Sequence, residues 1–214
     1  MERTVTVKGT GSLKLKPDLT VIRFELVTVD KSYDKAMRDS SDKLDELRQT
    51  LRGIGFSKDD LMTAGFNVRT KSRSRRDKNG DYVSVFEGYC CVHSLKLSFD
   101  FDSERLARVL SAITGCIAEP DLNIGFTVKD KNAVNEALLE SAARNARKKA
   151  EILTKASGVE LGELITISYN CEEFEFTSPT IYENAVCADK CAFADIEPDD
   201  IDVSDTATFV WSII

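Results

Sequence analysis

The sequence has little histidine, proline and tryptophan, and it has no long apolar run. Its 214 residues include one His, four Pro and one Trp, while 42% are hydrophobic and 30% are charged. This composition is typical of a globular protein and excludes the disordered and fibrous classes. A chain of this length buries enough surface to fold without disulfides or a metal. Because no apolar stretch approaches about 18 residues, the sequence predicts no membrane-spanning helix.

The first five residues lack the apolar segment of a secretory signal. We therefore expect a cytoplasmic protein. A signal peptide removed ahead of Met1 would make the protein periplasmic or exported instead.

The net charge of −7 is unevenly distributed. Residues 171–214, the acidic section, carry 11 Asp and Glu against one Lys, which leaves a charge of +3 on residues 1–170. A nucleic-acid-binding domain carries a clear positive excess, so we expect no nucleic-acid partner. The two regions can instead attract each other, within one chain or between chains.

Six cysteines are ordinary for a protein whose thiols stay reduced. Cys90 and Cys91 are adjacent, so on a strand they face opposite sides of the sheet. Cys171, Cys187 and Cys191 belong to the acidic section, but the four-residue step between the last two lacks a second cysteine pair or a His partner. We expect structural thiols, no cofactor and no metal; the alternative is a redox or metal site built from those three.

Hydrophobic periodicity predicts the order β-β-α-β-β-α-β-α-β-β. The strands are expected near residues 4–16, 22–26, 61–68, 83–101, 122–128, 165–169 and 203–213, and the helices near residues 32–55, 102–115 and 130–158. Asp102 or Ser103, and Asp130, are the expected N-caps of the second and third helices. Pro17-Asp18 suggests that the first two strands form a hairpin. The fold class is α+β, with helices packed on largely antiparallel sheets.

The fourth strand is unusually long. At about 3.3 Å per residue, a 19-residue strand spans roughly 60 Å, too much for one flat sheet, so we expect a bend near Gly88. Asn79-Gly80 before it is a strong hairpin turn signal. The hairpin either runs through two sheets or projects as a two-stranded arm.

Gly9 and Gly11 lie on the apolar side of the first strand. They leave room for something large to approach closely, or they mark a bulge. A phosphate loop is not predicted, because no third glycine and no helix N-terminus follows. A small-ligand module on this glycine-lined face is a second alternative function.

His93 is the only histidine, so any Ser-His or Cys-His nucleophile must use it. It lies in the middle of a predicted strand, on the apolar side, where a structural imidazole is expected. We predict no catalytic residues and no enzymatic activity.

The densest run of one charge sign is a basic cluster that we identify as the candidate partner-binding site. Its residues are Arg69, Lys71, Arg73, Arg75, Arg76 and Lys78. The cluster can hold an anionic partner, such as RNA phosphates or an acidic patch on another subunit, or it can be a solvated hairpin tip whose charge prevents aggregation. No aromatic residue lies between Arg69 and Lys78, which leaves base stacking without a platform.

Several short motifs, taken in order, cover almost the whole chain. They are Gly9-Thr10-Gly11 with Pro17-Asp18, Leu51-Arg52-Gly53-Ile54 before Asp60-Leu61-Met62-Thr63, Phe86-Glu87-Gly88-Tyr89, Ala146-Arg147-Lys148-Lys149-Ala150, Gly158-Val159-Glu160-Leu161-Gly162, and the closing strand from Val203 to Trp211. This series resembles the SIMPL-domain family, known from bacterial periplasmic proteins of the oxidative-stress and immunogenic type and from an animal kinase-binding signalling protein.

The resemblance implies an α+β fold with two sheet-helix subdomains, homo-oligomers in some bacterial members, and no established catalytic residues. We expect one domain over residues 1–214, with intertwined subdomains of residues 1–85 plus the C-terminal strand and residues 86–170. The leading hypothesis is a non-enzymatic, stress-related protein that acts by homo-oligomerisation or by binding a protein partner.

Overall fold

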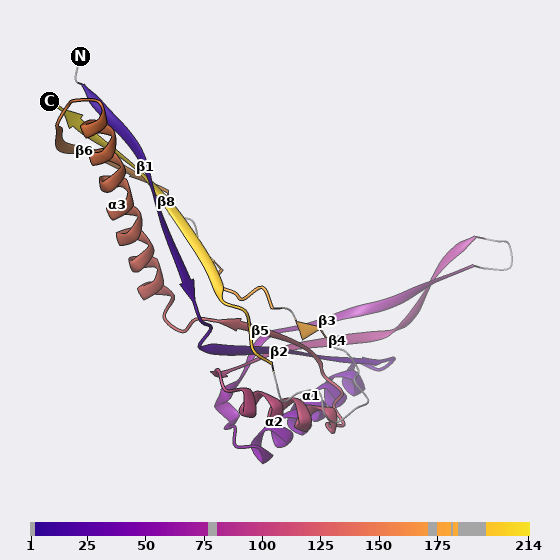
Figure 1. Ribbon diagram of the computed structural model, residues 1–214. Coiled ribbons are helices and arrows are strands. Elements are labelled where there is room, and N and C mark those ends of the chain that lie inside the picture. Colours follow the sequence, from indigo (N-terminus) through magenta and orange to yellow (C-terminus); the bar gives the residue numbers. More distant parts are fainter. Residues whose placement is uncertain (1–2, 77–80, 171–174, 181, 184–195) are drawn as a thin grey trace. The chain divides into compact units, whose positions relative to one another are not determined.

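The computed structural model describes residues 3–76, 81–170, 175–180, 182–183 and 196–214 (Figure 1). The helices are α1 (Tyr33–Gly53), the short 3₁₀ helix η1 (Lys58–Asp60), α2 (Ser103–Thr114) and α3 (Lys131–Ala156). The strands are β1 (Thr4–Leu15), β2 (Leu19–Asp30), β3 (Leu61–Arg76), β4 (Tyr82–Asp100), β5 (Asp121–Thr127), β6 (Leu161–Tyr169), β7 (Tyr182–Glu183) and β8 (Ile201–Ile213). The expected α+β class, with antiparallel sheets, is confirmed.

The chain folds into two compact units, each assembled from separate stretches. Unit 1 holds the described residues of Met1–Asp18, Thr127–Pro179 and Asp199–Ile214. Unit 2 holds those of Leu19–Phe126 and Thr180–Pro198. The division expected near residue 85 does not coincide with a boundary between these units, because β3 and β4 pair with each other inside unit 2.

Unit 1 is a three-stranded sheet, in the order β1-β8-β6, with α3 packed on one face. The expected hairpin between the first two strands is wrong, because β1 pairs along its whole length with β8 while β2 belongs to the other sheet. The apolar faces of β1 and β8 match: Val7 lies opposite Phe209. Both side chains pack in one buried cluster with the alanines of α3.

The glycines of β1 allow α3 to lie almost against the backbone of the strand. A Cβ atom added to Gly9 would collide with the carbonyl oxygen of Ala142 and lie 2.7 Å from the Cβ of Ala146. A Cβ atom added to Gly11 would collide with the carbonyl oxygen of Leu138. The close approach predicted for this face is therefore made by a helix. The small-ligand alternative is wrong for this face, since α3 already fills it.

Helix α3 also caps the outer edge of β1. The backbone N–H of Thr10 donates to Oδ1 of Asn145 at 3.1 Å, and Nζ of Lys149 donates to the carbonyl oxygen of Lys8 at 3.0 Å. An edge strand otherwise presents a row of unpaired backbone groups to other chains. The helix thus covers both the apolar face and part of the exposed edge of the N-terminal strand. Its own start is capped as predicted, with Asp130 accepting from the N–H of Ala133.

Unit 2 is a five-stranded sheet in the order β3-β4-β2-β5-β7, with α1 and α2 beside it (Figure 1). The core lies between the helices and the apolar side of β2 and β4. Its fully buried members include Ile22, Phe24, Leu26, Leu47, Leu95, Leu97, Leu106 and Val109. The predicted cap of α2 is confirmed, since Asp102 accepts from the N–H groups of Glu104 and Arg105.

Candidate functional site: a basic arm

The long hairpin of unit 2 extends beyond the sheet as a two-stranded arm. β2 pairs with β4 only from Asp100 back to Tyr89. Beyond that point β4 continues from Gly88 to Tyr82 and pairs with β3 alone. We call residues 71–76 and 82–88 the basic arm; Figure 1 shows it as the pink ribbon. Of the two predictions for the long strand, the projecting two-stranded arm is therefore correct.

The arm bends where the sequence predicts a bend. The register between β3 and β4 shifts between Lys71 and Ser72, which is a bulge, and Gly88 has a φ of +155°. A Cβ atom on Gly88 would lie 2.5 Å from the carbonyl oxygen of Asp30, at the end of β2. Only glycine fits here, because both the backbone conformation and the close approach exclude a side chain.

Aromatic contacts and a local ion pair hold the base of the arm. The ring of Tyr89 packs edge-on against Tyr33 at 5.5 Å and against Phe86 at 5.4 Å. The Asp30 carboxylate accepts from Nζ of Lys35 at 2.7 Å and from the N–H of Ser32 at 2.8 Å. The Lys35 bond, followed by the Ser32 bond, holds the pKa of Asp30 below its usual value. These contacts order the segment that meets Gly88.

The arm has two different faces, set by the pairing of β3 with β4. Arg73 lies opposite Val85, and Arg75 lies opposite Val83, on one side of the ribbon. We call this side the Arg–Val face. Both valines are more than 40% exposed, so the arm presents apolar and cationic groups together to solvent.

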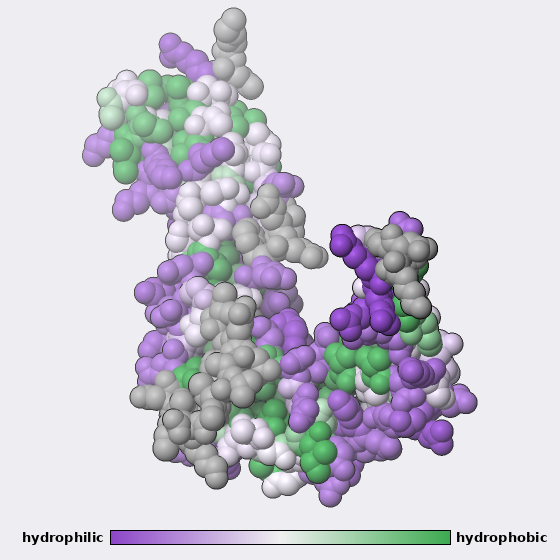
Figure 2. Space-filling view, turned by 90° about the vertical axis from the view of Figure 1, so that its right-hand side faces the viewer, coloured by the Kyte–Doolittle hydropathy of each residue, from purple (hydrophilic) through white to green (hydrophobic). Residues whose placement is uncertain are grey.

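The second side, the aromatic face, carries rings between serines. Arg76 lies opposite Tyr82, and Ser72 lies opposite Phe86. Tyr82 is 71% exposed and Phe86 is 47% exposed. The guanidinium carbon of Arg76 lies 5.2 Å from the centre of the Tyr82 ring, a cation–π contact. Figure 2 shows hydrophilic and hydrophobic surface side by side in this part of the molecule.

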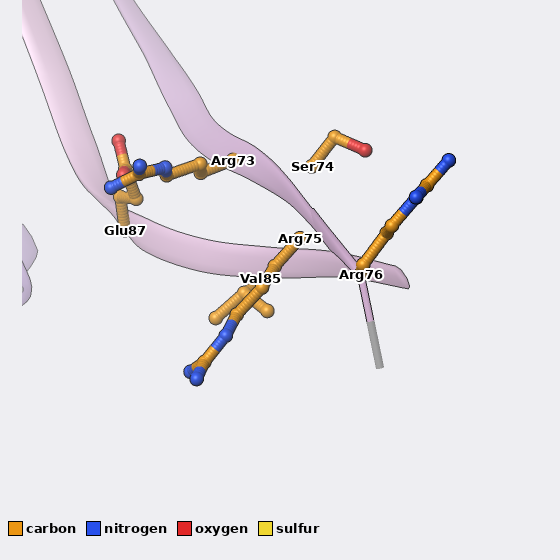
Figure 3. Close-up of a pocket in the computed structure, with 6 residues that line it drawn as sticks. All are labelled: Arg73, Ser74, Arg75, Arg76, Val85 and Glu87. Atoms are coloured by element: carbon orange, nitrogen blue, oxygen red, sulfur yellow. The ribbon is translucent and has the colours of Figure 1, made fainter. Parts of the chain in front are cut away.

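An open hollow of about 620 Å³ lies along the arm. It is lined by Arg73, Ser74, Arg75, Arg76, Val85 and Glu87. In Figure 3 the Arg73 side chain turns toward Glu87, Arg75 runs beside Val85, and Arg76 points away from both. The hollow lies on an exposed ribbon, and three of its six lining residues are arginines against one glutamate, so its chemistry suits an anionic macromolecular surface rather than an enclosed small substrate.

Four of the six predicted partner-binding residues lie together on the arm, Arg69 lies at its base opposite Cys90, and Lys78 falls outside the described residues. Lys71 pairs with Glu87, Nζ to Oε2, at 3.8 Å. Arg69, Arg73, Arg75 and Arg76 add four positive charges that are exposed to solvent.

The rings of the arm are the part of this surface that sequence reasoning missed. Tyr82 and Phe86 lie outside the basic run in the sequence, and the antiparallel register places them across from it. The signal was available: Asn79-Gly80 marks the turn, and counting outward from that turn approximately sets the pairing.

His93, for which a structural role is predicted, is buried and in contact with two side chains of β3. It is 8% exposed, its Nε2 lies 3.1 Å from Oγ1 of Thr63, and its ring packs edge-on against Phe66 at 5.1 Å. Burial, and after it the positive charge of Arg48, lowers the pKa of His93. Burial and the Arg48 charge therefore both oppose protonation of the ring.

Three of the six cysteines lie within the described residues and three lie outside them. Cys90, Cys91 and Cys116 are free and buried, and burial raises the pKa of the Cys91 thiol. Cys171, Cys187 and Cys191, the weak metal candidates, lie outside the described residues, so the redox or metal alternative stays a prediction. Over the described ranges, His, Cys, Asp and Glu side chains form no group of three suited to a metal. The helices placed by the structure include none long and apolar enough to cross a membrane.

Comparison with known proteins connects this fold to a family. Residues 5–211 match the model of the SIMPL family, described as "Protein of unknown function (DUF541)". The chain is 27% identical over 168 residues to the 26 kDa periplasmic immunogenic protein of Brucella melitensis, covering 77% of this chain and 65% of that protein. It is 26% identical to the protein of the same name from Brucella abortus, with the same coverage. It is 23% identical over 175 residues to the uncharacterized protein YggE of Edwardsiella ictaluri, covering 80% of this chain and 70% of that protein. The chain therefore spans just under two thirds of the length of the Brucella relatives.

Proposed function

This chain belongs to the SIMPL family, and we propose that it acts without catalysis, by assembling with copies of itself or with a protein partner through the basic arm. The observation that carries this proposal is the composition of the arm. Its exposed residues include arginines and the aromatic rings of Tyr82 and Phe86, types enriched at the centres of protein interfaces, and the exposed Val83 and Val85 add apolar surface.

The stability of the arm supports the same conclusion. A two-stranded ribbon is at best marginally stable alone in water, and three or more strands or a covering layer are needed to bury its side chains. Tyr82, Val83, Val85 and Phe86 are each between 41 and 71% exposed. Covering these four side chains with a partner removes apolar surface from water, which is the main driving force of association.

The charge of the chain indicates what kind of surface the arm meets. Two arms carry the same positive charge and repel each other, so face-to-face pairing of arms is disfavoured. The acidic section of the sequence has the opposite sign, and its described part includes exposed Asp202 on β8. Attraction between opposite charges steers association and weakens as salt is added. We therefore expect assembly that depends on ionic strength.

The setting we propose is periplasmic or exported, in place of the cytoplasmic expectation. The support is that the two Brucella relatives are named periplasmic proteins. Fractionation of cells producing the full-length protein tests this location: recovery only in the cytoplasm would contradict it.

A stress-related role is proposed on the resemblance to the family. Comparing the survival in peroxide of cells with and without the protein tests it.

The assembly proposal is tested by light scattering after size exclusion, in salt from about 50 to 500 mM. The wild-type chain is compared with the variant R73Q/R75Q/R76Q. A matched control, K131Q/K148Q/K155Q, removes three exposed charges from α3. We expect self-association, or retention of a protein partner, at low salt in the wild type and the control, with a loss in the arm variant. A wild-type chain that is monomeric at every salt concentration and retains no protein in a pull-down would overturn the proposal.

A further inference from the structure

The arm presents an unpaired strand edge as well as two faces. We infer that the outer edge of β3, along residues 69–76, accepts an acidic, extended segment of a separate partner protein as an added antiparallel strand. This inference rests on the proposed function and specifies the chemistry and the geometry of the partner.

The outer edge of β3 is open over the part of the chain that the structure describes. β3 is the terminal strand of the five-stranded sheet, with β4 as its only described neighbour. A terminal strand presents a row of backbone N–H and C=O groups, which is the template for strand addition. From Ser72 to Arg76 the pairing with β4 is regular, since both register shifts of this hairpin lie before Ser72. A regularly paired stretch of edge is therefore available at Arg73, Arg75 and Arg76.

The arginines are spaced for recognition by alternate residues. Arg73 and Arg75 are two residues apart on one strand, so their side chains leave the same face roughly 6.6 Å apart. The residue directly opposite each of them on an added strand has its Cβ about 5 Å away. Acidic residues at every second position of the partner would each meet one guanidinium on the Arg–Val face. The residues between them would meet the small side chains of Ser72 and Ser74 on the aromatic face.

The choice of arginine favours recognition over simple protection of the edge. Protection needs only charge, and lysine is the residue commonly used for it. Residues 69–76 contain four arginines and one lysine, and that lysine, Lys71, is already paired with Glu87. A guanidinium binds a carboxylate through two parallel hydrogen bonds, which an ammonium group cannot do. The edge therefore suits carboxylates held in fixed positions.

The arrangement of the faces favours an acidic peptide over a nucleic acid. Binding of a single strand combines phosphate contacts with bases stacked on neighbouring rings. Here Tyr82 and Phe86 lie on the opposite face of the ribbon from Arg73 and Arg75, so one strand cannot use both sets. The ring of Tyr82 is in addition already in contact with Arg76.

Fluorescence anisotropy with the full chain and labelled peptides of about ten residues tests the inference. The probe alternates Glu and Thr. The first control peptide has the same composition, with all of its Glu residues at one end. The second is the probe N-methylated at every second residue, which removes the backbone N–H donors along one edge of the strand. We expect the alternating probe to bind at least about tenfold more tightly than either of the other two. R73Q/R75Q should weaken it by at least about tenfold, and the control K148Q/K155Q should leave it unchanged.

Equal binding of the three peptides would reduce the contact to general charge attraction and overturn strand addition. Tighter binding of an oligothymidine of similar length, with the same dependence on Arg73 and Arg75, would assign the edge to nucleic acid and overturn the inference. If adding the probe abolishes self-association of the chain, the edge binds a second copy of this protein, and the inference of a separate partner protein is overturned. If no peptide binds while assembly still depends on the arm arginines, the inference fails and the proposed function stands.

Discussion

The packing of α3 against the glycines of β1 allows a quantitative prediction for Gly9→Ala. The new Cβ would overlap the carbonyl oxygen of Ala142 and lie 2.7 Å from the Cβ of Ala146. The oxygen belongs to helix backbone and cannot turn away, so α3 must move by about 1 Å or the strand must distort. Overpacking of this kind costs typically 1–3 kcal/mol, and the rigid backbone places this case near about 3 kcal/mol. Alanine's lower unfolded-state entropy offsets about 0.5 kcal/mol of that.

Thermal and urea unfolding followed by circular dichroism measure the effect. At roughly 2–4 °C per kcal/mol for a chain of this size, the melting transition that includes unit 1 should fall by roughly 5–10 °C. Gly65→Ala is the matched control, because a Cβ at that position on β3 meets no atom within 4 Å. Its transition should stay within about 2 °C of the wild type. If Gly9→Ala melts like the control, then α3 does not fill this face, and a ligand site on the glycine-lined face becomes tenable again.

Three further predictions follow from burial and backbone conformation. Burial lowers the pKa of His93, so the free energy of unfolding should fall as the pH drops below the unfolded-state pKa of about 6.5, by at most about 1.4 kcal/mol per pH unit. His93→Gln should flatten this pH dependence when it is measured by urea unfolding. Cys90, Cys91 and Cys116 are buried, so thiol titration of the native protein should detect at most three of the six thiols, and all six after unfolding in guanidinium. Gly88→Ala should loosen the base of the arm, lowering stability by about 1–3 kcal/mol and raising hydrogen exchange there.

Each of these outcomes has a result that would contradict it. An acid dependence unchanged in His93→Gln would mean that the imidazole titrates alike in both states. Rapid native reaction of more than three thiols would show that the buried cysteines are accessible. Wild-type hydrogen exchange in Gly88→Ala would show that the bend tolerates a side chain; Gly65→Ala again serves as the control.

Local sequence patterns predict the helices and strands, but they do not predict which strands pair. The alternation along β1 predicts a strand with one buried face, and Gly9 and Gly11 predict a close neighbour, because both features depend on the residue and its immediate surroundings. Alternation does not encode the partner strand, so Pro17-Asp18 suggested a hairpin with β2 while β1 in fact pairs with β8. The helices were located correctly because their stripes and caps are local.

The sequence predicts the positive charge of the candidate site but does not reveal the aromatic side chains beside it. A run of basic residues is visible in one segment of sequence. The aromatic face depends on register, since it joins residues from both sides of the turn: Tyr82 meets Arg76 only after the hairpin has formed. The open edge of β3 depends on the strand order of the whole sheet, which no short segment contains.

The pairing of β1 with β8 has a consequence for synthesis in the cell. β1 ends at Leu15 and β8 begins at Ile201, so the intervening chain is synthesised before β1 can meet its partner. At about 5–20 residues per second, β8 emerges roughly 10–40 s after β1. During that interval β1 lacks its pairing partner, and until α3 has emerged it also lacks its covering helix. It is then open to capture by chaperones, and the rate of translation between β1 and β8 governs how long that exposure lasts.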